Sequence, residues 1–127
     1  MIRVVQLGST RHRDEGLRLG TVRRPPRGVR KENYARGNYY DLWMPDLAPS
    51  AELFARRPAT DDEKSWNMFA RKYEAELKKP EASRLLDLLA AMSHQSNFSV
   101  GCYCDNEARC HRSVLRRVLA ERGAAIS

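Results

Sequence analysis

The feature that most constrains this chain is the segment 98–123, which reads FSVGCYCDNEARCHRSVLRRVLAERG. Up to Cys102, apolar residues alternate with small ones, a pattern that predicts a short strand. From about Cys110 the apolar residues recur at helical spacing, and Gly123 stands where a glycine commonly follows a helix. The segment therefore predicts a strand, a polar turn and a helix, with all three cysteines of the chain around the turn.

The start of this helix is a candidate anion site. Cys110, His111, Arg112 and Ser113 would occupy the first helical turn, where free backbone N–H groups and the helix dipole favour negative charge. Arg112 and the preceding Arg109 add positive charge beside them. We therefore expect Arg109, Arg112 and Ser113 to bind a small anionic ligand such as a phosphate. The alternative is an ordinary capped helix whose arginines face solvent.

The cysteines and the histidine support two further interpretations. Cys102, Cys104, Cys110 and His111 offer four zinc- or iron-type ligands, although Cys-x-Cys is tighter than the usual zinc spacing. In a strand, Cys102 and Cys104 would point to the same face. A cysteine at a helix N-terminus beside arginine has its thiolate favoured, so Cys110 and His111 are also a candidate catalytic pair. The alternative is that the cysteines are small buried hydrophobic residues, and we expect no cofactor.

A second turn could approach the same ligand. Residues 2–7 read as an N-terminal strand and are followed by Gly8 and Ser9, small residues whose amides can contact an anion. If this strand and the strand at 98–103 are parallel in one sheet, both turns lie on its carboxyl edge. Ligands of open α/β sheets bind at that edge.

Positive charge is concentrated near the N-terminus. The 127-residue chain has a net charge of +7, and residues 1–40 hold ten Lys and Arg against three Asp and Glu, whereas residues 41–127 hold thirteen of each. One of these residues, Arg27 in the loop RRPPRG, joins the candidate anion site. A nucleic-acid surface is the alternative function, formed by the basic residues of this region: Arg11, Arg13, Arg18, Arg23, Arg24, Arg27, Arg30, Lys31 and Arg36. A basic loop that contacts only solvent would show the same sequence pattern.

The order of elements predicts an α/β fold, a single small domain over residues 1–127 with a mainly parallel sheet flanked by helices. Further strands are expected at 19–22 and 39–44. Helices are expected after Ser50, after Thr60 with Glu63 as its capping partner, and from Pro80 to about Ser93. The lone carboxylate of Asp41 is expected to accept hydrogen bonds from a neighbouring arginine.

The cysteine count and the hydropathy predict the cellular compartment of the protein. No apolar stretch approaches the ~20 residues of a membrane span, so no membrane partner is expected. An odd number of cysteines clustered in one segment argues against a disulfide scaffold. We therefore expect a cytoplasmic, reduced protein.

Several motifs distributed along the chain occur together: Pro26-Arg27-Gly28 with Lys31, YDLWMPDLAPSAEL at 40–53, Phe69 with Arg71-Lys72-Tyr73 and Glu76-Leu77, and Cys102 before Cys110-His111-Arg112-Ser113. On these motifs the chain resembles the family called domain of unknown function 488, in particular its YeaO-like branch. Cys104 stands where the wider family often has glutamate, and Arg23-Arg24-Pro25 replaces a segment that commonly reads Asp-Arg-Leu-Trp.

The resemblance implies a small cytoplasmic α/β protein and supports treating Cys102, Cys110, His111 and Arg112 as one unit. It implies no established activity. We expect a pocket between the Gly8 turn, the PPRG loop and the start of the last helix.

Overall fold

The computed structural model describes residues 1–58 and 62–127. Its sheet has the order β1-β4-β2-β3, and all of its described strand pairs are parallel. The strands are β1 (Ile2–Gln6), β2 (Leu17–Gly20), β3 (Leu42–Trp43) and β4 (Phe98–Cys102). The first strand and the strand at 98–103 are parallel neighbours, with Ile2 opposite Phe98 and Gln6 opposite Cys102, so the condition for both turns to lie on one edge of the sheet is met.

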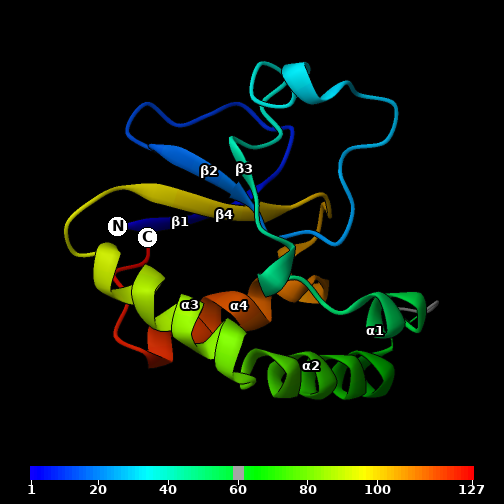
Figure 1. The fold of residues 1–127 in the computed structure, drawn as a ribbon. Helices are drawn as coiled ribbons and strands as arrows, with labels where there is room; N and C mark the ends of the chain where they lie inside the picture. Colours follow the sequence, from blue (N-terminus) through cyan, green and yellow to red (C-terminus); the bar gives the residue numbers. More distant parts are fainter. Residues whose placement is uncertain (59–61) are drawn as a thin grey trace.

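The helices gather on one face of this sheet (Figure 1). They are α1 (Ala51–Ala55), α2 (Glu63–Leu77), α3 (Pro80–Met92) and α4 (His111–Glu121), with short 3₁₀ turns η1 (Lys31–Asn33), η2 (Pro45–Leu47) and η3 (Glu107–Arg109). The connection from β2 to β3, residues 21–41, crosses the other face. Its paired prolines prevent a long helix there. The predicted α/β domain is therefore confirmed, with helices on one side and an irregular connection on the other.

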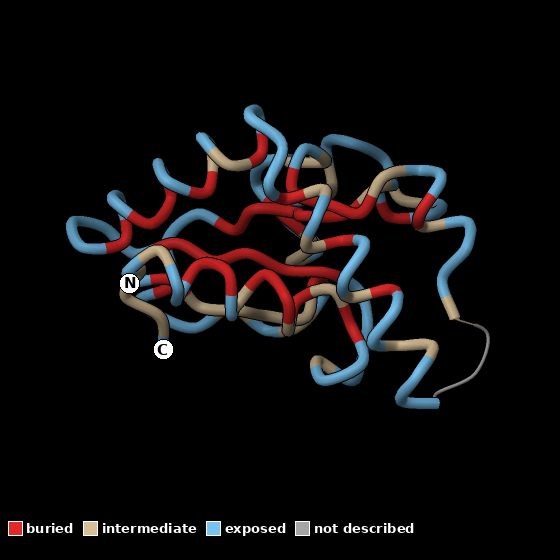
Figure 2. Tube along the Cα trace, turned by 90° about the horizontal axis from the view of Figure 1, so that it is seen from below, coloured by how far each residue is buried: buried red, intermediate tan, exposed pale blue. Residues whose placement is uncertain are grey.

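The main core lies between the sheet and the helices. β4 is buried along its whole length and β2 along most of it, whereas the helices alternate between buried and exposed residues (Figure 2). Leu19, Phe98 and Val100 contribute from the sheet, and Leu86 and Leu115 from the helices. This arrangement follows from the period of 2 in the strands and of 3.6 in the helices.

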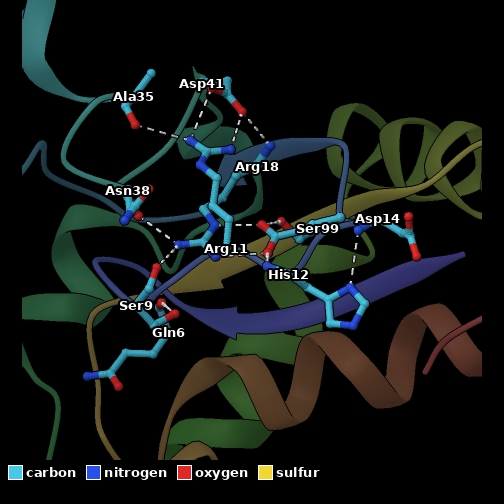
Figure 3. Close-up of polar contacts among 11 residues, drawn as sticks. Gln6, Ser9, Arg11, His12, Asp14, Arg18, Ala35, Asn38, Asp41 and Ser99 are labelled. Atoms are coloured by element: carbon cyan, nitrogen blue, oxygen red, sulfur yellow. Dashed lines mark hydrogen bonds and ion pairs between the residues drawn. The ribbon is translucent and has the colours of Figure 1, made fainter.

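The other face of the sheet carries a buried polar network (Figure 3). Arg18 is fully buried, and it donates from Nε to Glu15 Oε2 at 2.6 Å and from Nη2 to Oε1 at 2.9 Å. Ser99, the register partner of Arg18 in β4, donates to the same carboxylate at 2.6 Å. The Nη1 of Arg18 donates to the carbonyl oxygens of Ser9 and Asn38. The network therefore fixes the irregular segments to the sheet.

Several sequence predictions need correction at their boundaries. The strand expected at 39–44 is reduced to β3, and β2 begins two residues before the expected start. The N-cap of α2 is Asp62, which accepts from the Ser65 amide, whereas Thr60 lies outside the described residues. Cys102 and Cys104 do not share a strand face, because β4 ends at Cys102; Cys102 is buried and Cys104 is exposed.

Other predictions agree with the structure. Ser50 caps α1 by accepting from the Leu53 amide, and α3 begins at Pro80. Asp41 accepts two hydrogen bonds from Arg11 and one from the Arg18 amide, as expected of a structural acceptor. Within residues 1–58 and 62–127 no helix combines the length and apolarity that crossing a bilayer requires.

Candidate functional site

Two adjoining cavities lie at the carboxyl edge of the sheet, where β4 ends and α4 begins. Their volumes are about 480 and 290 Å³. They share five lining residues, Pro49, Phe54, Arg57, Cys104 and His111. We treat them together as the edge cleft. Its position is the one at which open α/β sheets bind their ligands.

The charged side chains that line the edge cleft are positive. Five arginines line it: Arg23, Arg24, Arg27, Arg57 and Arg109. Among the described residues that line it there is no aspartate or glutamate. A concave surface lined with one sign of charge raises the local concentration of ions of the opposite sign.

The arginines that line the cleft differ in whether their side chains already make hydrogen bonds within the protein. Arg23 donates to the carbonyl oxygens of Pro49 and Pro45 and is therefore structural. Arg57 donates to the Phe54 carbonyl and covers the Phe54 ring at 4.1 Å. Arg24 and Arg27 are exposed, and in the described part of the chain their side chains have no ion pair. Arg24, Arg27 and the outer part of Arg57 are thus positioned to contact a ligand.

Aromatic rings complete the walls. Tyr39 and Tyr103 line the larger cavity and meet edge to face, with ring centroids 6.5 Å apart. The Tyr103 hydroxyl donates to the Arg24 carbonyl at 2.9 Å, which connects the end of β4 to the PPRG loop. Trp66 and Phe69 from α2 stack at 5.6 Å and line the smaller cavity. Trp66 and Phe69 recur at helical spacing, which is typical of core residues and gives no sign that they also line a cavity.

The cap of α1 positions one wall. The Ser50 hydroxyl accepts from the Leu53 amide at 3.1 Å and donates to Glu76 Oε2 at 2.5 Å, and the Ser50 amide donates to Glu76 Oε1. This arrangement fixes α1 to α2. Phe54 in α1 and Arg57 just after it therefore face the cleft.

His111, the first residue of α4, lies in the floor of the cleft. Its Nε2 donates to the Thr21 carbonyl at 2.7 Å, since a carbonyl oxygen can only accept. Its ring also meets Tyr73 edge to face. Burial lowers the pKa of His111 to about 4, so the imidazole is neutral near pH 7. With Nε2 protonated, the lone pair is on Nδ1, which lies 3.9 Å from the Cys110 sulfur.

Cys102, at the end of β4, and Cys110, the N-cap residue of α4, bring their sulfur atoms to disulfide distance. The expectation that the cysteines are reduced is therefore corrected for this pair, because the end of the strand and the start of the helix place the two sulfurs side by side. Both are buried. Together with a ring nitrogen of His111 they place three donor atoms within 4.8 Å of one another. Cys104, the fourth predicted ligand, is exposed on the cleft wall and is not part of this group.

The predicted anion-binding residues of α4 take different positions. Arg112 is buried and donates to the Cys104 carbonyl at 2.6 Å, and its Nε has no hydrogen-bond partner among the described residues. Ser113 donates to the Cys110 carbonyl. Neither residue lines the edge cleft, whereas Arg109 lines its smaller cavity. Arg112 therefore supports the loop between Cys104 and α4 from within.

The Gly8 turn lies apart from the cleft lining. The Gly8 amide donates to the Asn38 carbonyl and the Ser9 amide to the Gln6 carbonyl. The Ser9 hydroxyl also donates to Gln6 at 2.5 Å. These donors are already used, so the pocket we expected between three segments is formed by the PPRG loop, α1 and the start of α4.

The N-terminal basic residues are less available than their number indicated. Arg11 pairs with Asp41, Arg18 is buried against Glu15, and Arg23 donates to backbone carbonyls. The others with an exposed side chain are Arg13, Arg24, Arg27, Arg30, Lys31 and Arg36.

The geometry allows two kinds of chemistry at the floor of the cleft. When Cys102 and Cys110 are reduced, the neutral imidazole can accept a proton from the Cys110 thiol through Nδ1, or the same nitrogen and the two sulfurs can bind a metal ion. Either would act beside an arginine-lined space.

Comparison with known proteins gives one match. The model of the family described as "DUF488-N3a: Active DUF488-N3 subclade" matches residues 2–123. No curated protein and no solved structure matches the chain.

Proposed function

The chain belongs to the DUF488 family, whose model spans nearly all of it, and we propose that this member binds a small anionic ligand, such as a phosphate ester, in the edge cleft. The match concerns the DUF488-N3 subclade and is consistent with the YeaO-like branch. The matched subclade is described as active, which favours a cleft that handles a ligand over a purely structural one.

The observation that carries this proposal is the lining of the cleft. It combines five arginines with no carboxylate among its described residues. Arginine presents several N–H donors in a planar fork that suits phosphate and carboxylate oxygens. Arg24 and Arg27, in the loop RRPPRG, have exposed side chains without an ion pair to any described residue, and they line the larger cavity together with Arg57 and His111. A ligand in this cavity would be within reach of arginines from two separate segments.

The cleft volume sets the size of the ligand. About 480 Å³ lies in the range of pockets that enclose small molecules, and the rings of Tyr39, Phe54 and Tyr103 offer apolar contact beside the charges. The proposed ligand is therefore a small organic anion rather than an extended polymer.

A test compares binding of inorganic pyrophosphate by calorimetry in the wild type and in Arg27→Ala, Arg57→Ala and Arg84→Ala. Arg84 is an exposed arginine on α3 that does not line the cleft, so it is the matched control. Each charge-assisted hydrogen bond contributes about 1.5–3 kcal/mol, so each cleft variant should weaken binding by roughly tenfold or more. Arg84→Ala should bind as the wild type does. The proposal fails if the two cleft variants bind like Arg84→Ala.

A nucleic-acid ligand makes a different prediction. Binding of a single-stranded oligonucleotide would weaken steeply with salt and would depend on Arg13, Arg30 and Arg36, which lie outside the cleft lining. If Arg13→Ala lowers affinity for pyrophosphate and oligonucleotide as much as Arg27→Ala does, the basic N-terminal surface is the binding part.

A further inference from the structure

The floor of the edge cleft contains a donor set that the binding of an anion by arginines does not require. Cys102, Cys110 and His111 come from the end of one strand and the start of one helix, and their donor atoms lie within 4.8 Å of one another. Two sulfurs and one imidazole nitrogen are ligands that zinc prefers.

The hydrogen bond of His111 orients the imidazole for this role. Because Nε2 donates to the Thr21 carbonyl at 2.7 Å, the unprotonated nitrogen is Nδ1, on the side of Cys110. Histidines that bind metals commonly donate their other ring N–H to a carbonyl or a carboxylate, which fixes the tautomer and the ring orientation.

The backbone separation of the two cysteines also favours a shared ion over a permanent disulfide. Their Cα atoms are 7.9 Å apart. Disulfides usually join Cα atoms about 4.4–6.8 Å apart, and pairs more than about 7 Å apart need backbone movement to be bridged. Both segments are held firmly, Cys102 by the pairing of β4 with β1 and Cys110 by the Glu107 carbonyl, which accepts from its amide.

The surroundings leave room for one more ligand. Cys102 and His111 line the larger cavity, and Cys110 and His111 line the smaller one. Structural zinc sites are closed by four protein ligands, whereas catalytic sites keep a position for water or substrate. Three ligands that all face an open cleft match the second type.

From this geometry we infer that Cys102, Cys110 and His111 bind a zinc ion whose remaining coordination position opens into the edge cleft. Binding releases the protons of the two thiols, so the ion and its two thiolates together carry no net charge. Cys104 is not a ligand. It lies on the exposed wall, outside the group of three donors.

The test uses the untagged full chain, purified with a reductant that does not bind metals. Mass spectrometry should find about one zinc per chain, and Co²⁺ added to the metal-free protein should give the absorption of tetrahedral thiolate coordination. Cys102→Ser and Cys110→Ser should each lower the metal content and remove this absorption. Cys104→Ser, the matched control, should retain both.

A second measurement does not depend on the variants remaining folded. Alkylation of the zinc-loaded wild type should modify Cys104 alone. In the reduced, metal-free protein Cys102 and Cys110 should also react, more slowly than the exposed Cys104, because both line the cleft although they are largely buried. The inference is overturned if the reduced protein binds neither zinc nor Co²⁺. It is also overturned if Cys104→Ser loses as much metal as Cys110→Ser, or if all three thiols react equally with and without zinc. The pyrophosphate titration is made on metal-free protein, because pyrophosphate can itself bind zinc, so its outcome is separate from the outcome of the metal analysis.

Discussion

The imidazole of His111 donates a hydrogen bond from Nε2 to the carbonyl oxygen of Thr21 at 2.7 Å. This bond joins the first residue of α4 to the residue that follows β2, although 90 positions separate them in the chain. Thr21 is itself fixed to β4, because its amide and its hydroxyl both donate to the Gly101 carbonyl. The floor of the edge cleft is therefore tied to the centre of the sheet.

Substitution of His111 by phenylalanine tests this link. The ring contact with Tyr73 can remain, but the buried Thr21 carbonyl loses its donor. We expect His111→Phe to lower the free energy of unfolding by about 1–3 kcal/mol. The measurement is urea denaturation of the metal-free protein, so that loss of a bound ion does not contribute. A stability equal to that of the wild type would show that the bond contributes nothing net to the fold.

The Glu15–Arg18 pair predicts a large effect on stability. Both side chains are buried, and Glu15→Gln leaves the guanidinium of Arg18 without its counter-charge. Breaking a buried pair costs about 3–5 kcal/mol. Thermal and chemical denaturation should show this loss, and Glu32→Gln, at an exposed pair with Arg30, should change stability by less than about 1 kcal/mol. Equal effects of the two substitutions would contradict this account.

The carboxylate of Glu15 should also make the stability of the protein depend on pH. Burial alone would raise the pKa of Glu15, but the hydrogen bonds from Arg18, Ser99 and the His12 amide outweigh it and lower the pKa from 4.5 to about 2. A group with a lowered pKa stabilises the fold fully above its unfolded pKa. This contribution should be lost progressively as the pH falls from about 4.5 towards 2. Denaturation midpoints across this range should show a smaller slope in Glu15→Gln than in the wild type.

Removal of the Ser50 cap of α1 should have a smaller effect on stability. Ser50→Ala removes the acceptor of the Leu53 amide and the hydroxyl donor to Glu76. Loss of such a cap costs about 1 kcal/mol. Ser65→Ala in the first turn of α2 is the control, since in the described part of the chain the Ser65 side chain makes no hydrogen bond, and only its amide is used. Two variants of equal stability in urea denaturation would show that the cap does not hold α1 in place.

Much of the fold could be predicted from local pattern. The alternation before Cys102, the helical spacing after Cys110 and the glycine at 123 are local signals, and β4 and α4 occur where they predict them. Local sequence pattern did not predict the secondary structure where tertiary contacts determine it. The strand expected at 39–44 is only Leu42–Trp43, and Tyr40 instead packs against Gly20, where an added Cβ would lie 2.3 Å from the ring.

The site could be predicted only in part. Cys110 and His111 were identified by their place at a helix start, and Arg27 by its basic loop. Phe54, Arg57 and Tyr103 were not found, because they reach the cleft only through α1 and the contact between Tyr103 and Arg24. The burial of Arg18 could not be predicted either, since a sequence does not distinguish a fully buried arginine from a solvated one. The match over residues 2–123 confirmed the family that the motifs had indicated.

The measurement that tests the central claim most directly is an NMR titration of the labelled protein with inorganic pyrophosphate. The account predicts that the side-chain Nε–H signals of Arg27 and Arg57 and the backbone amides of Tyr103 and Cys104 shift together and saturate, while the signals of Arg13 and Arg36 do not. Shifts centred on Arg13 and Arg36 that vanish with added salt would contradict the account and place anion binding on the N-terminal surface.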